Sequence, residues 1–487
     1  MNNSIYSNIK ESKTGDLLPF FTDGKSMDSF YNPVKEAESI ILQLEKSYNF
    51  FIITGLGSGI LLKNLLQTFP ESKIIVIENS QADYDYLKQL PLINTLYNNK
   101  NVIFSTISSI KEDLQNNYIP ALYGELKIIQ RQSWISHINF EELNLKVSEA
   151  LNIISNDFAT QSFFGKIWQY NIIKNLKLYK NCNKIDNKIQ IDINKTALVV
   201  AAGPSLDSKI DLIKKQRNNY FIIATDTAFS ILSNNNIQSD IAISIDGQNV
   251  SYNHFNNLKQ NYSNTIFLFD FCANSNCVSY LQKKNATIGF FKSMHPLLNF
   301  IQNNFKILSS GTGTITMSAL DLAVQLGFKN IEILGADFGY INGKSYAKGT
   351  YLDTLYQKSA NKIKPSELIF DKLLFRTNLI KNESKVTTKL LLNYQQSLEN
   401  YVQSYGLEFK NENYSYKITN NSKKSLTIND FFTDFKYDDF ICKLKSLNKE
   451  QLLVALLPYI AFLRGKNSKL SWEEYLNRAY KDLLRLI

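Results

Sequence analysis

The 487-residue sequence has few of the residues from which metal sites, disulfide frameworks and membrane spans are built. Its 4 cysteines form no C-x-x-C pair and its 3 histidines are isolated, so neither a structural metal nor a disulfide framework is indicated. The longest apolar run, 452–463, has 12 residues and contains Pro458, which is too short for a membrane span of about 20 residues. That run predicts a buried helix. The first 20 residues lack the apolar core of a signal peptide, so we expect a cytoplasmic protein.

Charge is also sparse and evenly spread. Lys and Arg together number 54 against 44 Asp and Glu, which gives a net charge of +10 without any block of five like charges. This pattern argues against a nucleic-acid-binding surface and is compatible with an enzyme that takes a small anionic substrate. Hydrophobic residues make up 44% and charged residues 20%, so the whole chain is expected to fold, into about three domains.

The order of apolar runs and glycine turns predicts an α/β protein. We expect a Rossmann-like N-terminal domain over 1–139 and a helical connector over 140–190. A central doubly wound domain is expected over 191–364, because five or six short apolar strands alternate there with helices. Strands fade beyond about residue 360, so we expect a helical C-terminal domain over 365–487.

A glycine-rich turn characterises the N-terminal domain. The apolar strand 49–54 (NFFIIT) leads into GLGSG (55–59), and the next strand ends near Glu78. These are the parts of a Rossmann half-unit, which would hold an adenine nucleotide or S-adenosylmethionine with Glu78 on its ribose. The glycines could equally serve only a tight turn and close helix packing, so both interpretations stay open. A D-x-D sequence at 83–85 lies on a predicted helix, and we reject it as a donor site.

Polar residues follow the strands of the central domain at their carboxyl ends, where the ligand crevice of an open parallel sheet lies. One such acid is more often a helix cap, but five strand ends that carry a glycine loop or a carboxylate favour a nucleotide site. Free amides at a helix start suit a phosphate. The candidate nucleotide-binding residues are Gly203, Pro204, Ser205, Asp226, Thr227, Ser310, Gly311 and Thr312.

Three segments of this domain carry a family resemblance. They are AAGPSLD (201–207), the stretch from IIATD to ISID (222–246), and the stretch from SSGTG to YAKGT (309–350). They resemble the central domain of the motility-associated factor (Maf) flagellin glycosyltransferases, which is shared with archaeal 6-hydroxymethylpterin pyrophosphokinases. The match covers most of residues 140–420. In the connector it includes Thr160, Gly165, Trp168 and Asn175.

The resemblance implies transfer of a nonulosonic acid, pseudaminic or legionaminic, from its CMP-activated form to Ser or Thr hydroxyls of flagellin in the cytoplasm. The same segments are similar, more distantly, to bacterial sialyltransferases with a GT-A-like variant fold. In those enzymes a G-P-S-L loop and an S-G loop hold CMP, and two tyrosines six residues apart contact the leaving phosphate. The similarity therefore implies that role for Tyr340 and Tyr346.

The acceptor hydroxyl also needs a base. With so few histidines a strand-end carboxylate is the available choice, so Asp246 and Asp337 are the candidates, followed by His295. A departing phosphate needs hydrogen-bond donors more than a metal, so we expect no cofactor beyond the donor, CMP-nonulosonate. Other classes stay open: a pterin pyrophosphokinase that uses ATP, a methyltransferase that uses S-adenosylmethionine, and a non-catalytic flagellin-binding protein.

Overall fold

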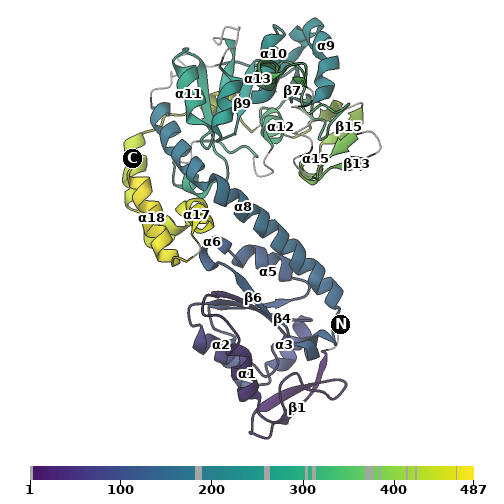
Figure 1. Cartoon of the computed structure of the whole chain (residues 1–487), viewed down its shortest axis with the longest axis vertical. Helices are drawn as coiled ribbons and strands as arrows, with labels where there is room; N and C mark the ends of the chain where they lie inside the picture. Colours follow the sequence, from purple (N-terminus) through teal and green to yellow (C-terminus); the bar gives the residue numbers. More distant parts are fainter. Residues whose placement is uncertain are drawn as a thin grey trace. The chain divides into compact units, whose positions relative to one another are not determined.

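The structure is a computed structural model that divides into two compact units. The first consists of Met1–Gly165 with Leu457–Lys481, and the second of Lys166–Leu456 with Asp482–Ile487. The expected α/β class is confirmed, since mainly parallel sheets are combined with many helices (Figure 1). The structure describes residues 4–180, 189–256, 264–301, 305–309, 314–366, 368, 375, 378–382, 385–412, 415–422, 425–467 and 469–487.

The first unit is built on a parallel sheet with the strand order β5-β4-β3-β6. Its two central strands are apolar and buried, as is typical of parallel strands covered on both faces. An antiparallel hairpin of β1 (Tyr6–Glu11) and β2 (Leu17–Phe21) precedes it. The sheet strands are β3 (Phe50–Thr54), β4 (Lys73–Glu78), β5 (Val102–Thr106) and β6 (Leu126–Ile129). The helices are α1 (Pro33–Ile41), α2 (Ile60–Thr68), α3 (Gln81–Leu87), α4 (Pro91–Leu96), α5 (Ile110–Asn117), α6 (Pro120–Tyr123) and α7 (Gln132–Ile135).

Three helices include residues of both units. The connector is one 40-residue helix, α8 (Phe140–Tyr179). The apolar run 452–463 lies within α17 (Lys449–Lys466), so the helix predicted there is present, with Pro458 inside it. The third is α18 (Trp472–Leu484). Within the first unit, α8 and α17 pack closely, because a Cβ added to Gly165 would lie 1.8 Å from the carbonyl oxygen of Pro458.

The second unit contains a sheet that, among the described residues, has eight strands in the order β11-β10-β9-β8-β7-β12-β16-β15. The strands from β11 to β12 run parallel, and β16 and β15 are antiparallel. The chain starts in the middle at β7, proceeds to β11 on one side and returns to β12 on the other. The strands are β7 (Thr196–Val200), β8 (Tyr220–Thr225), β9 (Ile241–Ser244), β10 (Ile266–Asp270), β11 (Thr287–Phe291), β12 (Asn330–Leu334), β15 (Glu408–Glu412) and β16 (Ser415–Thr419).

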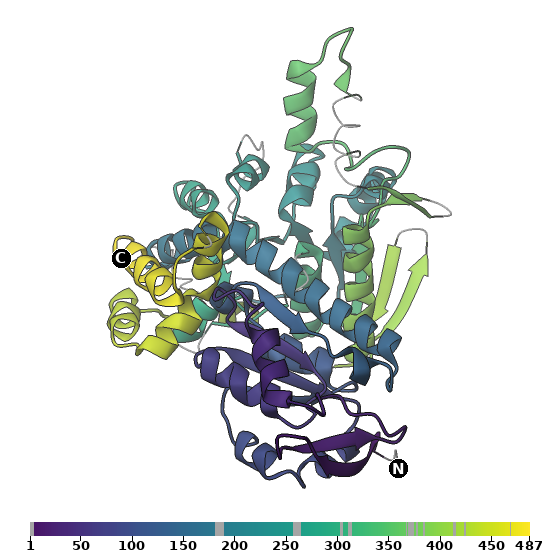
Figure 2. The same cartoon turned by 60° about the horizontal axis from the view of Figure 1, so that its bottom comes forward.

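The helices of this unit pack against the sheet, including its two antiparallel strands β16 and β15. α12 contacts four of the central strands, and residues of α15 share a buried core with β12 and β16. Figure 2 shows α15 alongside the antiparallel strands β15 and β16. The α-helices are α9 (Ile210–Lys215), α10 (Asp226–Asn234), α11 (Ser275–Gln282), α12 (Ile315–Gln325), α13 (Tyr351–Ser359), α15 (Lys389–Ser404) and α16 (Tyr437–Lys445); a small hairpin pairs β13 (Ile380–Asn382) with β14 (Lys385–Thr387).

The C-terminal segment contains helices, as expected, and also strands that the sequence did not predict. The sheet continues beyond residue 364, because β16 pairs with β12 and β15 pairs with β16. Both strands have only five residues, and their polar residues outnumber the apolar ones, which gives a weak local signal. Residues 457–481 belong to the first compact unit instead of a separate domain.

Candidate functional site

The strand order predicts a ligand crevice between β7 and β12, because the chain adds β8 to β11 on one side of β7 and then returns to add β12 on the other side. In open α/β sheets ligands bind beyond the carboxyl ends of the strands at such a point. The loops after the two strands cross in contact, since the amide of Gly203 donates to the carbonyl of Gly335 over 2.8 Å. A Cβ at Gly203 would lie 2.4 Å from that oxygen, so this close crossing requires glycine. Pro204 follows, buried, at the first position of a 3-10 turn (Pro204–Ser208).

Ser205 and Asp337 are brought together, and they bind each other. The amide of Ser205 donates to Oδ2 of Asp337 over 2.8 Å, and its hydroxyl donates to Oδ1. Burial raises the pKa of Asp337. Its carbonyl oxygen accepts from Nζ of Lys385 over 2.5 Å. The loop amide that the sequence offered to a phosphate is therefore engaged by a carboxylate of the protein.

Asp226 begins α10, is buried, and is likewise held by its neighbours. Its Oδ1 accepts from the amide of Thr227 over 2.7 Å and from the hydroxyl of Thr227 over 3.2 Å. Its Oδ2 accepts from Ser244 Oγ over 2.8 Å, which ties the end of β8 to the end of β9. Asp270, at the end of β10, accepts from the amide of Cys272 over 2.6 Å, and burial raises its pKa to about 6.

Asp246 is half-buried two residues after β9 and faces a different environment. Its Oδ1 accepts from the amide of Gln248 over 2.9 Å. Burial is the main cause that raises its pKa; the charge of Asp226 acts in the same direction, and His254 acts in the opposite one. Asp246 thus lies close to a second carboxylate and to an imidazole.

His254 is a site residue that the sequence analysis counted only among isolated histidines. It ends a 3-10 turn (Asn249–His254) and is buried, with Nε2 at 3.4 Å from Thr227 Oγ1. Its ring packs edge-on against Tyr351, with 5.0 Å between ring centroids. Within the described structure its Nδ1 has no hydrogen-bond partner. The only sequence signal was its position in the loop after Asp246.

The predicted tyrosine pair belongs to a larger aromatic group. Burial raises the pKa of Tyr346, and the neighbouring Tyr340, Asp226 and Asp246 add to this, although the side chain is 40% exposed at the surface. Burial raises the pKa of Tyr340 and brings that of Tyr351 to about 12. These side chains therefore remain protonated phenols at neutral pH. The backbone fixes the loop, since the amide of Tyr340 donates to the carbonyl of Val386 over 2.6 Å.

The remaining central candidates are a loop of three small residues and His295. Ser310, Gly311 and Thr312 lie outside the described residues. His295 caps a 3-10 turn, since its Nδ1 accepts from the amide of Leu297 over 3.2 Å. Burial lowers the pKa of His295 to about 3, so it stays neutral, and it serves as a cap before Pro296.

The glycine turn of the first unit is filled by the protein's own side chains. Asp28 Oδ2 accepts from the amide of Ser58 over 2.7 Å, and Asp28 pairs with the buried guanidinium of Arg131 at 3.0 Å. A Cβ at Gly57 would lie 2.5 Å from Asp28 Oδ2. This carboxylate thus takes the position that a phosphate would need at the start of α2.

Glu78 is also engaged by the protein. It is fully buried and accepts from the amide of Leu56 over 2.6 Å, from Tyr6 Oη over 3.0 Å and from Trp134 Nε1 over 2.8 Å. These contacts argue against the interpretation in which Glu78 binds a ribose. The alternative interpretation, a tight turn with close packing, accounts for the glycines.

Neither the D-x-D sequence nor other side chains form a metal centre in the described ranges. Asp83 is buried and accepts from Ser80 and from Ser4, while Asp85 is exposed and pairs with Lys88. No three His, Cys, Asp or Glu residues of the described chain are grouped so that they could hold a metal ion. No helix in the same ranges is both long and apolar enough to cross a membrane.

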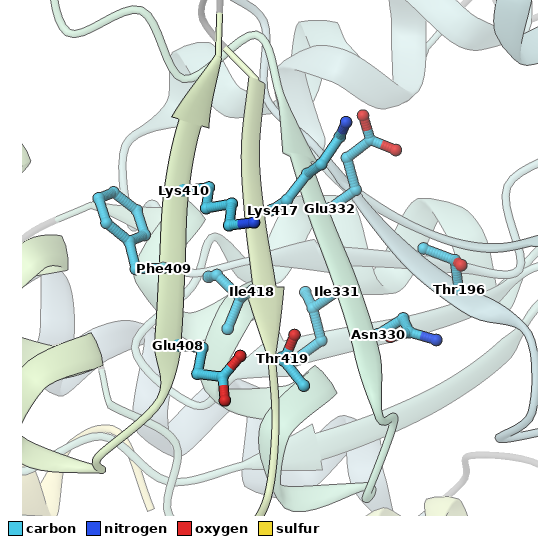
Figure 3. A pocket seen from close by; sticks show the side chains of 10 residues that line it. All are labelled: Thr196, Asn330, Ile331, Glu332, Glu408, Phe409, Lys410, Lys417, Ile418 and Thr419. Carbon is cyan, nitrogen blue, oxygen red and sulfur yellow. The ribbon is translucent and has the colours of Figure 1, made fainter.

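A hollow lined by polar and apolar side chains lies over β12, β16 and β15 and not at the crevice (Figure 3). It begins at Thr196 and Asn330, the first residues of β7 and β12, which places it at the amino ends of the parallel strands. The other lining residues are Ile331, Glu332, Glu408, Phe409, Lys410, Lys417, Ile418 and Thr419. Because ligand crevices of such sheets lie at the opposite ends, we do not assign the site here.

Comparison with known proteins shows what this chain is similar to. A family model described as 6-hydroxymethylpterin diphosphokinase MptE-like matches residues 170–343. Two uncharacterized proteins of Treponema pallidum (strain Nichols) are each 33% identical, one over 150 residues (30% of this chain, 70% of the relative) and one over 117 residues (24% and 42%). The structure of the Maf glycosyltransferase from Magnetospirillum magneticum AMB-1 has a TM-score of 0.52 at 13% identity, over 100% of this chain and 86% of that one. The resemblance drawn from the sequence is thus confirmed: the chain belongs to the family of the first T. pallidum protein, and it is Maf-like in fold with an MptE-like central domain.

Proposed function

We propose that this protein is a glycosyltransferase that moves a nonulosonic acid, pseudaminic or legionaminic, from its CMP-activated form to Ser or Thr hydroxyls of flagellin in the cytoplasm. One observation carries the proposal. The phenols of Tyr346 and Tyr351 lie near the carboxylates of Asp226 and Asp246, in loops and helix starts that follow the parallel strands of a Maf-like fold. Hydrogen-bond donors beside a carboxylate are what transfer from an activated sugar phosphate requires.

The tyrosines serve the leaving group in this proposal. Transfer breaks the bond between the anomeric carbon and the phosphate oxygen, so negative charge grows on CMP. Tyr340 and Tyr346 keep their protons, because burial raises the pKa of each, and they donate hydrogen bonds that strengthen as this charge develops. The loop at Gly203 and the start of α10 at Thr227 would line the nucleotide subsite.

Asp246 serves the acceptor. The hydroxyl oxygen forms the new bond to the anomeric carbon, and its proton passes to the carboxylate of Asp246. Burial raises the pKa of Asp246, which makes its carboxylate a stronger base. Asp337 is the weaker candidate, because both of its oxygens already accept hydrogen bonds from Ser205.

Two alternatives fare differently. A methyltransferase would need the glycine turn of the first unit, where Asp28 and Glu78 already occupy the amides of Ser58 and Leu56. The match of residues 170–343 to an MptE-like model favours a second candidate, a pterin pyrophosphokinase that uses ATP.

Ligand-induced stabilisation of the full-length protein separates these functions. A ligand at 100 times its Kd stabilises the folded state by about 2.7 kcal/mol, so CMP should raise the Tm while ATP and S-adenosylmethionine should not. Mass spectrometry of flagellin incubated with the protein and a CMP-nonulosonate should then show the added sugar. Stabilisation by ATP and not by CMP would instead support the pyrophosphokinase.

A matched pair of variants ties the activity to the site. Tyr346→Phe removes the hydroxyl of a tyrosine in the cluster and keeps its ring. Tyr405→Phe makes the same change at an exposed tyrosine that stacks on Tyr401. Only the first substitution should reduce sugar transfer. Equal rates for both variants and the unsubstituted protein would remove the tyrosine cluster from the mechanism.

A further inference from the structure

Two asparagines, one turn apart on α8, bind the loops after β9 and β10. Asn171 and Asn175 are 3% and 0% exposed, so both amide side chains are removed from water. A buried amide of this kind must be satisfied by the protein. Asn171 binds both loops, whereas Asn175 donates only to the loop after β10 and its Oδ1 has no hydrogen-bond partner within the described structure. This difference separates their roles.

Asn171 joins both loops. Its Nδ2 donates to the carbonyl of Gly247 over 3.0 Å and to that of Cys272 over 3.1 Å. Its Oδ1 accepts from the amide and the hydroxyl of Ser275, each over 3.3 Å. Both hydrogens and both acceptor positions of the amide are therefore used.

The two carbonyls that converge on Asn171 belong to a crowded place beside Asp246. A Cβ at Gly247 would lie 2.9 Å from the carbonyl oxygen of Cys272 and 3.2 Å from Asn171 Nδ2. On the other side, the carbonyl of Asp246 accepts from the amide of Asn274 over 3.0 Å. Without a donor between them, two buried carbonyl oxygens repel each other and remain unsatisfied, so the loop must move.

Asn175 donates two similar hydrogen bonds, both to the loop after β10. Its Nδ2 donates to the carbonyl of Phe271 over 2.9 Å and to that of Ala273 over 2.7 Å, both after β10. It has the same side chain as Asn171, lies on the same helix and is equally buried, but among the described residues it makes no hydrogen bond to the loop of Asp246. Asn175 is thus a matched control.

We propose that Asn171 is a positioning residue that holds the carboxylate of Asp246 in place through the carbonyl of Gly247. The inference rests on the proposed function for its catalytic meaning, because Asp246 is the base there. A base displaced by about 1 Å loses on the order of 100-fold in rate even when the substrate still binds. The loss should therefore appear in kcat and not in the affinity for the donor.

The amide of Gln248 gives a readout that needs no activity. It donates to Oδ1 of Asp246 over 2.9 Å, so its hydrogen exchange reports whether the carboxylate keeps its position. In full-length Asn171→Ala, exchange at Gln248 should speed up, while in Asn175→Ala it should remain at the rate of the unsubstituted protein. Equal acceleration in both variants, or none in Asn171→Ala, would overturn the positioning role.

Kinetics then test the catalytic meaning. With a CMP-nonulosonate and flagellin, Asn171→Ala should lower kcat about 100-fold with little change in donor KM. Asn175→Ala should leave kcat within a few-fold. Similar kcat losses in both variants would show a merely structural role for Asn171. If no preparation transfers sugar while Gln248 exchange still separates the two variants, the proposed function fails and the positioning of Asp246 stands.

Discussion

Replacing Glu78 by glutamine tests whether a carboxylate of the protein itself binds the backbone of the glycine turn in the first unit. The carboxylate of Glu78 is fully buried and accepts from three donors, the Leu56 amide, Tyr6 Oη and Trp134 Nε1. Burial outweighs these bonds and raises the pKa of Glu78 from 4.5 to about 7. A side chain bound in this way should make the stability of the unit depend on pH.

The sign of the pH dependence follows from the pKa of Glu78 in the folded and unfolded states. In the unfolded chain Glu78 loses its proton near pH 4.5, whereas in the folded protein it keeps the proton up to about pH 7. The folded state is therefore favoured at low pH, and stability falls as the pH rises from 4.5 to about 7. At about 1.4 kcal/mol for each pH unit, this difference corresponds to about 3 kcal/mol. Above pH 7 the penalty stays constant.

Glutamine removes the titration but keeps the size. It cannot accept from all three donors, so at pH 5 we expect the variant to be about 1–3 kcal/mol less stable than the unsubstituted protein, and position 78 no longer adds a pH dependence to the stability of the variant. Urea unfolding of both proteins at pH 5, 6, 7 and 8 should show the difference in unfolding free energy, unsubstituted minus Glu78→Gln, fall by about 3 kcal/mol. Glu141→Gln, at an exposed position of α8, should give a constant difference. A constant difference for Glu78→Gln would refute the reasoning.

Three further predictions concern the site and the packing. Tyr346→Phe should lower kcat about 100-fold with donor affinity nearly unchanged, because the lost hydrogen bond strengthens only in the transition state; steady-state kinetics would contradict this if the rates matched. EDTA should leave sugar transfer intact, and a loss that magnesium or manganese restores would make the strand-end acids metal ligands. Gly165→Ala should lower the Tm by overpacking that costs about 3 kcal/mol or more, since its Cβ would lie 1.8 Å from the carbonyl oxygen of Pro458. Gly465→Ala, whose Cβ would lie 3.3 Å from Ser162 Cβ, should change the Tm much less, and equal shifts would contradict the packing.

Local patterns were sufficient for the parallel strands of both units. Apolar runs such as TALVVAA and NIEILGA form β7 and β12, and the polar residues after them lie at the carboxyl edge as expected. The two added strands were missed because five mostly polar residues resemble an exposed loop. β16 forms because the edge of β12 offers unpaired amides and carbonyls, a reason that exists only once the sheet is assembled.

The closed glycine turn could not be predicted from local sequence. Asp28 reaches the amide of Ser58 across 30 residues, and Trp134 reaches Glu78 across 56. No short motif reports such partners, so a turn that binds a nucleotide and a turn filled by an aspartate have the same pattern. The role of Gly203 was likewise hidden in the sequence, because the absence of a Cβ there makes room for the carbonyl of Gly335. Substitution of Gly203 would therefore disturb the contact between the loops after β7 and β12 as well as any bound ligand.

The strand-end acids divide by what they bind, and this division decides which of them can act on a substrate. Asp226 and Asp337 accept hydrogen bonds on both oxygens from neighbouring amides and hydroxyls, the behaviour expected of caps. Asp246 lies instead beside His254 and the tyrosines, half-buried, with its loop fixed by Asn171. A carboxylate whose two oxygens both accept hydrogen bonds from the protein stabilises the fold. A half-buried carboxylate such as Asp246, whose loop is fixed by other residues, can receive a proton from a substrate. The sequence placed these acids on one edge, but only their hydrogen-bond partners separate structural from chemical roles.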